Sequence, residues 1–297
     1  MIVSKLLLIA GLIAHVTPSP TSIDTRSNSV NLSPIVSRDE MPEELKSLFH
    51  AMAKKSGDPI SEDDMEDRVL AARSESIMMG ERNSYFMSYA FLTPTIPGLP
   101  WYEDDVLGRL RGNDEQSLLD VGSGPLPDLH WLLKDGVTKE KLFGTDLKGE
   151  FFAMGKKAFG KSHLDDDQLY GGVDLTKLDL IKGSKLDNHR FSIVYASRLF
   201  HLFRKDKEQK DIAANLLYML AKKQKGAAAL ITGWTMAEAQ LSGPWAAATH
   251  NEKSWEKLWD DAKDGYTGDG EIARIDTYIS VQEPAQGSFK VLVTFED

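Results

Sequence analysis

The segment that most constrains the fold is SLLDVGSGPLPDLHWLL, residues 117–133. An apolar run leads into Asp120, then Gly122 and Gly124 follow, and a helical pattern begins after two prolines. Glycine lacks a Cβ atom, so the backbone can turn sharply here and lie close to a ligand. The simpler interpretation is that the glycines only form a strand-to-helix turn. The segment therefore predicts a buried strand, a tight turn and a helix.

Beyond residue 115 the sequence alternates between strand and helix patterns. The predicted strands are 117–121, 142–147, 168–175, 191–203, 227–234, 274–282 and 288–295, and the predicted helices between them include 128–136, 150–160 and 211–226. Strands that alternate with helices of this length favour a parallel sheet covered on both faces. The last two strands flank Glu-Pro-Ala-Gln-Gly and predict a hairpin. We expect an α/β, Rossmann-like, seven-stranded sheet, mostly parallel with a C-terminal antiparallel hairpin.

The residues before this alternation divide into three predicted parts. Residues 1–17 contain an apolar run of signal-peptide length, shorter than the about 20 residues of a membrane-spanning helix. The run predicts a secretory signal or a short membrane anchor, and the alternative is a disordered or wrongly assigned start. Residues 18–40, rich in Ser, Thr, Pro and Asn, predict a disordered linker. Residues 41–114 predict a helical cap, with one helix closed by Gly57 and a second opened by Ser61.

Composition excludes several functions. The formal net charge is −10, which disfavours nucleic acid as a partner because phosphate binding needs clustered Lys and Arg. The chain has no cysteine, which excludes disulfides, Cys-bound zinc and a thiol nucleophile. The acidic stretches at 163–168 and 264–271 do not match calcium-loop spacing. We expect no metal.

Acidic residues follow the predicted strands at the edge where the glycine turn lies. Asp120, Asp146 and Asp174 stand at the expected ends of the first three strands. A dinucleotide fingerprint needs G-x-G-x-x-G, and Pro127 occupies the third glycine position. An acidic edge repels phosphate and suits a nucleoside that carries positive charge. Asp146 is placed to accept hydrogen bonds from ribose hydroxyls, and Asp174 from an adenine amine.

These motifs together resemble class I S-adenosylmethionine-dependent methyltransferases. LLDVGSG is similar to the first motif of that class, LFGTDL to the second and GGVDLTKL to the third, and FSIVYASRLFHLF is similar to the segment that follows. Residues 91–110 and 249–262 are similar to small fungal methyltransferases of terpenoid and meroterpenoid biosynthesis. The resemblance covers roughly residues 60–297. The chain departs from the pattern at Leu126, where a third glycine is common, and at Trp234 and Thr235, where the fungal group usually has Arg-Gln.

The resemblance implies S-adenosyl-L-methionine as the cofactor, and it implies a set of site residues. The expected cofactor-binding residues are Asp120, Gly122, Ser123, Gly124, Asp146, Leu147, Asp174, Leu175 and Ser197. His201 is the catalytic candidate because it follows the fourth strand and imidazole can take a proton near neutral pH. A structural histidine among apolar neighbours is the alternative. The expected substrate-contacting residues are Trp101, Tyr102, Trp234 and Trp245.

The expected function is O-methylation of a small apolar secondary metabolite, at a carboxylate or a hydroxyl. The alternative is a non-catalytic binding or regulatory protein that keeps the methyltransferase fold. The expected partner is a small molecule, with membrane association through the N-terminus. We expect a cytoplasmic or membrane-tethered, cytosol-facing domain, and the apolar leader leaves the secretory pathway as the alternative.

Overall fold

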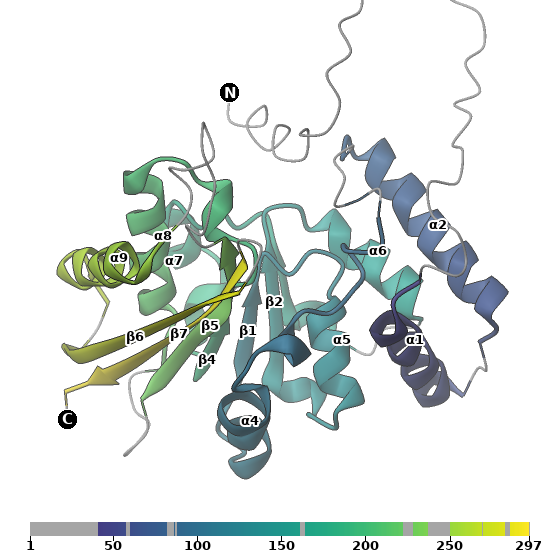
Figure 1. Ribbon diagram of the computed structural model, residues 1–297, viewed down its shortest axis with the longest axis horizontal. Coiled ribbons are helices and arrows are strands. Elements are labelled where there is room, and N and C mark those ends of the chain that lie inside the picture. The colour runs from purple at the N-terminus through teal and green to yellow at the C-terminus, as the bar shows by residue number, and fades with distance from the viewer. Residues whose placement is uncertain are drawn as a thin grey trace, which may run out of the picture.

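A computed structural model describes residues 41–57, 60–81, 86, 88–160, 164–221, 228–236, 250–268, 270–282 and 286–296. These residues form a sheet with helices packed on both of its faces (Figure 1). The predicted leader and linker, residues 1–40, lie outside the described residues.

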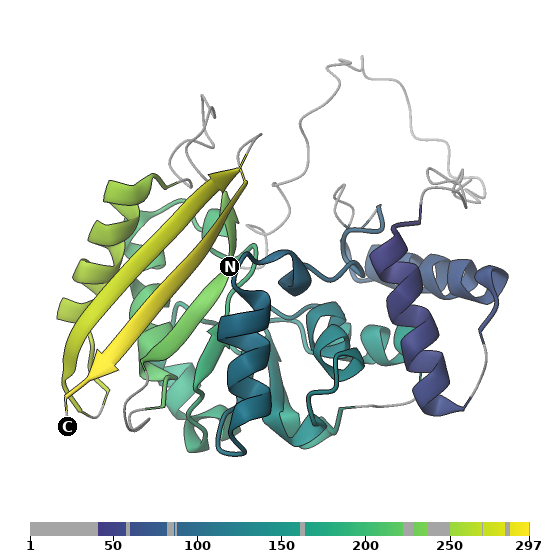
Figure 2. The same ribbon diagram turned by 60° about the horizontal axis from the view of Figure 1, so that its bottom comes forward.

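The sheet contains seven strands within the described residues, in the order β3-β2-β1-β4-β5-β7-β6. Their bounds are β1 Leu118–Val121, β2 Leu142–Asp146, β3 Leu169–Gly171, β4 Ile193–Tyr195, β5 Ala229–Met236, β6 Ile272–Gln282 and β7 Gln286–Phe295. The first five strands pair in parallel, whereas β7 pairs antiparallel with both β5 and β6. Figure 2 shows β6 and β7 (yellow) as a long pair beside β5. The predicted fold class, with its C-terminal hairpin, is confirmed.

Eight α-helices of the described chain surround this sheet. Their bounds are α1 Glu43–Ser56, α2 Glu62–Met78, α4 Gly108–Gly112, α5 Pro127–Lys134, α6 Glu150–Phe159, α7 Leu178–Lys182, α8 Asp206–Tyr218 and α9 Glu252–Asp264. None of the described helices is long and apolar enough to cross a membrane.

Two separate apolar cores lie on the two faces of the sheet, because successive side chains of a strand point to opposite faces. In β1, Leu118 packs in one core with residues of α1, α2, α4, α5 and α6. Its neighbour Leu119 packs in the other core with residues of α7, α8 and α9. The short central strands are buried on both faces, as their continuous apolar sequences predict.

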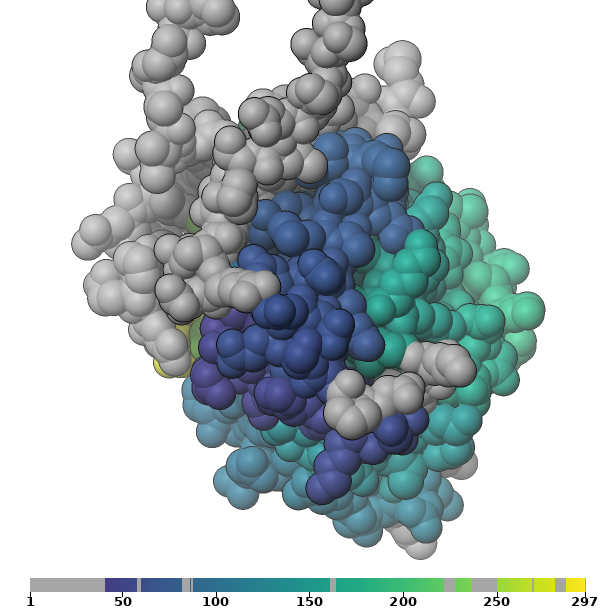
Figure 3. Space-filling model, turned by 90° about the vertical axis from the view of Figure 1, so that its right-hand side faces the viewer, coloured from purple at the N-terminus to yellow at the C-terminus, as the bar shows by residue number. Residues whose placement is uncertain are grey.

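The helices α1 and α2 have the ends that the sequence predicts. Gly57 ends α1 in the left-handed region at φ 74°, and Ser61 opens α2 with a reciprocal capping box to Asp64. Both helices lie against α6, and α1 also contacts α5. Figure 3 shows them (purple and blue) beside the teal surface of the sheet domain.

Three predicted elements differ from the observed ones. The third strand ends at Gly171, and the fourth ends at Tyr195 before a short 3₁₀ turn at Phe200–Leu202. The helix predicted at 211–226 begins earlier, at Asp206, and ends at Tyr218. Just after it, Leu220 forms a parallel bridge with Phe191, and the Ala221 N–H donates to the Phe191 carbonyl at 2.7 Å; residues 222–227 lie outside the described residues. Tertiary pairing thus ends this helix against its local propensity.

Candidate functional site

The glycine turn lies at the carboxyl edge of the parallel strands. Gly122 and Gly124 have φ values of 71° and 50°, so both adopt the left-handed conformation that glycine tolerates. The N–H groups of Gly122 and Ser123 donate to the Thr145 carbonyl at 2.8 and 3.1 Å. The turn is therefore fastened to the end of β2, and its first glycine occupies the point where ligands bind in open α/β sheets.

Asp146 ends β2 as predicted, and its carboxylate faces this turn. Oδ2 accepts from the Gly124 N–H at 3.0 Å, and Oδ1 accepts from the Lys148 N–H at 2.8 Å. Burial raises the pKa of Asp146 to about 6, although the two N–H donors oppose that rise. The group is thus mostly ionised at neutral pH, and each oxygen retains a lone pair for a ligand hydroxyl.

Asp120 is a buried carboxyl group at the penultimate position of β1. Its side chain is 3% exposed, and Oδ2 has no hydrogen-bond partner among the described residues. Burial raises its pKa well above the ordinary value, and the charges of Asp128 and Asp146 raise it further. Such an unpaired buried acceptor beside two carboxylates favours a ligand that brings positive charge or a donor to this edge.

Asp174 does not stand at a strand end, so that prediction is wrong. The chain leaves β3 at Gly171 because the Gly172 N–H turns to the Asp146 carbonyl at 2.9 Å. Asp174 Oδ1 then accepts from the Thr176 N–H and Oγ1 at 3.0 and 2.7 Å, and Oδ2 pairs with Lys177. Burial raises its pKa, but these donors outweigh burial and lower it.

Leu147 and Leu175, also expected near the cofactor, differ in exposure. Leu147 follows Asp146 and is 44% exposed. Leu175 is buried in the core with α7 and α8. Leu147 is therefore the one of this pair that a ligand at the edge can cover.

The segment after β4 holds Ser197, Arg198 and His201. Arg198 adopts φ 54°, a strained value for a non-glycine residue, while its N–H donates to the Trp234 carbonyl at 2.7 Å. A Cβ atom at Gly233 would lie 2.5 Å from the Ala196 carbonyl oxygen, so glycine permits this close approach of β5. The segment is thus held tightly against β5.

His201 sits in the 3₁₀ turn after β4, and its Nδ1 atom is buried without a partner in the described chain. Burial lowers its pKa to about 4, and the nearby Arg198 charge lowers it further. The imidazole is therefore neutral at physiological pH and a weak base. Its position fits the sequence prediction, but its basicity limits the chemistry it can perform.

The predicted substrate aromatics make internal hydrogen bonds. Trp101 Nε1 donates to Thr232 Oγ1 at 2.8 Å, and Trp234 Nε1 donates to the Thr95 carbonyl at 2.9 Å. Tyr102 is buried, and its hydroxyl donates to Asp135 Oδ2 at 2.6 Å. Asp135 follows the C-terminal end of α5, so Tyr102 points away from the carboxyl edge, contrary to the prediction. Trp245 lies outside the described residues.

Sequence reasoning missed a polar cluster centred on Thr95. Asp128 Oδ1 accepts from the N–H groups of Thr95 and Ile96 at 2.6 and 2.7 Å. The Thr95 hydroxyl lies 3.2 Å from Asp128 Oδ2, 2.7 Å from the Tyr195 hydroxyl and 3.1 Å from Ser197 Oγ. The sequence gives only weak signals for this cluster: Thr95 lies between two prolines, and Asp128 is an acidic residue in the first turn of a helix.

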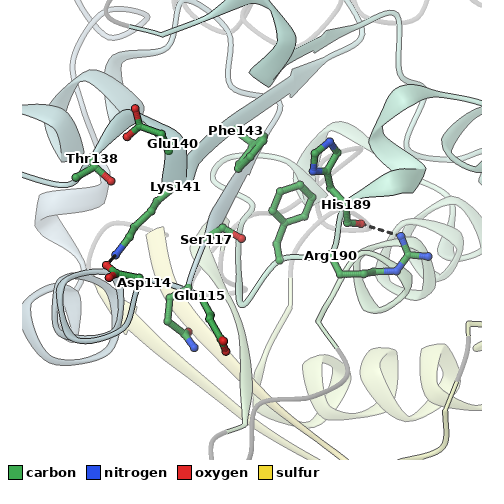
Figure 4. Close-up of a pocket in the computed structure, with 11 residues that line it drawn as sticks. Asp114, Glu115, Ser117, Thr138, Glu140, Lys141, Phe143, His189 and Arg190 are labelled. Atoms are coloured by element: carbon green, nitrogen blue, oxygen red, sulfur yellow. Dashed lines mark hydrogen bonds and ion pairs between the residues drawn. The ribbon is translucent and has the colours of Figure 1, made fainter.

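A cavity of about 400 Å³ lies at the opposite, amino edge of the sheet (Figure 4). It is lined by Asp114, Glu115, Gln116, Ser117, Thr138, Glu140, Lys141, Phe143, His189, Arg190 and Phe191. Its Lys141 is already bound by the Leu110 and Asn113 carbonyls. None of the predicted site residues contributes to this cavity. Across the described residues, no cluster of His, Asp and Glu could hold a metal ion.

The strand order, the glycine turn after β1 and the carboxylate that ends β2 define a Rossmann-like fold of the seven-stranded methyltransferase type. No family model matches the chain.

The chain is similar in sequence to several fungal methyltransferases, as predicted. It is 29% identical over 181 residues to the methyltransferase adrK of Penicillium roqueforti, covering 58% of this chain and 60% of that protein. It is 32% identical over 116 residues to the O-methyltransferase atr3 of Stereocaulon alpinum, covering 39% of this chain and 32% of that protein. The matched part thus spans about three fifths of the length of adrK.

Among solved structures, the chain is similar to OxaC in complex with SAH and oxaline. The identity is 17%, the TM-score is 0.45, and the match covers 68% of this chain and 48% of that chain. At this distance the likeness carries no argument about the site, and the fold assignment rests on the strand order itself.

Proposed function

We propose that this protein transfers a methyl group from S-adenosylmethionine to a small acceptor. The observation that carries the proposal is the buried Asp120 carboxyl group, whose Oδ2 atom has no partner among the described residues, beside the Gly122–Gly124 turn and the Asp146 carboxylate. An edge with these groups suits a nucleoside whose tail is cationic and that lacks phosphate. The sequence similarity to fungal methyltransferases supports the same conclusion.

The residues at this edge fit the cofactor in three ways. Asp146 would hold the ribose hydroxyls, because its oxygens keep acceptor capacity beyond their two N–H bonds. Asp120 would face the cationic tail, which supplies the partner that its Oδ2 atom lacks. Leu147 would lie against the base, which would cover its exposed surface. The cofactor supplies a methyl group already activated by its sulfonium.

The protein's own part in this reaction is mainly to position the acceptor and exclude water. A hydroxyl acceptor also needs a general base, and His201, with a pKa of about 4, is a weak one. A carboxylate is already ionised and needs no base. Burial raises the pKa of Asp128 and lowers that of His201, and the Arg198 charge lies close enough to oppose the first change and to add to the second. We therefore propose an apolar carboxylic acid as the acceptor and a methyl ester as the product.

Calorimetry with S-adenosylmethionine and S-adenosylhomocysteine tests the cofactor assignment. Wild-type protein should bind both ligands. Asp146→Asn should weaken binding about 100-fold, because the two ribose hydroxyls would no longer donate to a charged carboxylate. The matched control is Asp114→Asn at the amino edge, where binding should not change. No heat with folded wild-type protein would contradict the proposal.

Turnover assays then separate enzyme from binding protein. Apolar carboxylic acids should be methylated, and the matched primary alcohols should not. Cofactor binding without turnover on any acid or phenol would instead favour a non-catalytic binding or regulatory protein with this fold.

For location, we propose a cytosol-facing domain that residues 1–17 tether to a membrane. The support is the apolar run of those residues together with a donor made in the cytosol. Fractionation of a C-terminally tagged protein tests this proposal, together with a glycosidase shift assay at Asn31, which lies in the N-glycosylation motif Asn31-Leu32-Ser33. A glycosylated Asn31 would place the domain in the secretory pathway instead.

A further inference from the structure

Residues 91–107, named here the strap, connect the described part of the N-terminal region to α4. Three sets of hydrogen bonds fasten the first half of the strap to α5 and β5, and its second half is held by the bonds of Tyr102 to Asp135 and of Lys290 to Asp105. Thr95 and Ile96 bond to Asp128 of α5, the Thr95 carbonyl accepts from Trp234 of β5, and Trp101 donates to Thr232 of β5. It thus bridges elements on both sides of β4.

The side chain of Thr95 is the point where these elements meet. Its hydroxyl contacts Asp128 from α5, Tyr195 at the end of β4 and Ser197 in the exit from β4. Asp128 is 7% exposed and Tyr195 is fully buried, so these bonds form away from bulk water. Polar contacts in such surroundings are strong when satisfied and costly when broken.

The placement of this cluster links the two halves of the proposed site. Asp128 lies in the first turn of the helix that follows the Gly122–Gly124 turn, and its charge raises the pKa of Asp120. Ser197, on the other side, leads to Arg198 and His201, beside which the acceptor would lie in the proposed reaction. Thr95 therefore lies between the proposed cofactor side and the proposed acceptor side.

We propose that Asp128 and Thr95 are positioning residues that hold the strap over the carboxyl edge, where it forms the wall of the acceptor site. This inference rests on the proposed methyl transfer. Asp128 Oδ1 accepts from two backbone N–H groups of the strap and Oδ2 accepts from the Thr95 hydroxyl, while that hydroxyl also fixes the distance of the strap from the β4 exit. The strap would then present the same fixed surface to each acceptor molecule that binds.

A merely structural role would predict that only stability changes when these bonds are removed. A positioning role predicts a split between acceptor and cofactor effects, because the strap is not bonded to Asp146 or to the glycine turn. It also predicts rescue by a variant that keeps the hydroxyl. Thr95→Val and Thr95→Ser differ in that group at nearly constant size, so they form the test pair.

The experiment compares Thr95→Val, Thr95→Ser and Thr93→Val in the full chain. Thr93→Val is the matched control, because the Thr93 hydroxyl donates to the carbonyl of Tyr89, just before the strap, at 2.8 Å and makes no hydrogen bond to Asp128. Three readouts are needed: steady-state kinetics with an apolar carboxylic acid, calorimetry with S-adenosylhomocysteine, and hydrogen exchange of the strap amides.

Thr95→Val should lower kcat/KM for the acceptor about tenfold, mostly through KM, because it removes several buried hydrogen bonds. Exchange at residues 95 and 96 should accelerate by a similar factor, and the Kd for S-adenosylhomocysteine should stay within about twofold. Thr95→Ser should restore both values. Asp128→Asn should behave like Thr95→Ser, since an amide can still accept from both N–H groups and donate to the hydroxyl.

Two results would overturn the proposal. In the first, Thr95→Val and Thr93→Val have equal effects on KM and on strap exchange. In the second, Thr95→Val weakens cofactor and acceptor binding equally. Failure of the proposed function would give a different result, because wild-type protein itself would then bind no S-adenosylhomocysteine or would not methylate any acid. That result would overturn the positioning role as well.

Discussion

The raised pKa of Asp146 predicts a measurable pH dependence of stability. In the folded protein the pKa of the Asp146 carboxyl group is about 6, against an ordinary value of 3.8, because the group is buried. That rise corresponds to about 3 kcal/mol, at 1.36 kcal/mol for each pKa unit. A raised folded-state pKa stabilises the protein fully below the unfolded pKa, and this contribution is lost as pH rises through about 6.

The perturbation that isolates this effect is Asp146→Asn, whose side chain does not titrate. Of the about 3 kcal/mol, roughly 2 kcal/mol falls between pH 4.5 and pH 7.5 by the two-pKa linkage relation. The wild-type protein should therefore lose about 2 kcal/mol relative to Asp146→Asn over that interval. Urea unfolding of both proteins at both pH values, without cofactor, measures the difference.

Asp174→Asn is the control with the opposite sign. The pKa of Asp174 is lowered from its ordinary value of 3.8, so its ionised form stabilises the folded state, and this contribution is lost only as pH falls below that value. The difference between wild type and Asp174→Asn should therefore stay constant from pH 4.5 to 7.5, and wild type should lose stability relative to this variant below about pH 4. If the difference between wild type and Asp146→Asn stays constant from pH 4.5 to 7.5, the reasoning about buried charge at this edge is refuted.

Three further outcomes are expected. Gly155→Ala should destabilise by roughly 3 kcal/mol in urea unfolding, because its Cβ would lie 2.0 Å from the Pro125 carbonyl oxygen, whereas Gly112→Ala, with open space, should be neutral within about 0.5 kcal/mol. Gly124→Ala should lose about 1 kcal/mol through its φ of 50° alone, since no atom crowds the added methyl group. His201→Gln should lower kcat/KM less than about tenfold, with a flat profile from pH 6 to 8; a 100-fold loss would identify a general base and a hydroxyl acceptor.

Elements with strong local signals could be predicted from the sequence. The strands β1 and β2, the ends of α1 and α2 and the position of Asp146 follow from apolar runs, glycines and capping residues. These features depend on neighbours within a few residues, and such neighbours are visible in a sequence pattern.

Features that depend on distant partners could not be predicted. The strand predicted through Asp174 stops early because Gly172 bonds to the Asp146 carbonyl, which lies in another strand. Thr95 and Asp128 lie 33 positions apart, and no periodicity connects them. Tyr102 was expected to contact the substrate, but its hydroxyl donates to Asp135, just after the C-terminal end of α5. Each case needs a tertiary contact that local chemistry does not specify.

The position of β7 between β5 and β6 has a consequence for folding. The edge of β5 stays open until α9 and β6 have been made, because its neighbour comes later in the chain than both. During synthesis the apolar strand β5 therefore has unpaired backbone N–H and C=O groups along one edge until β7 is made. Such an exposed edge promotes association between chains. Removing β7 would also leave β6 without a partner among the described strands, so trimming this hairpin should yield insoluble protein instead of a smaller folded domain.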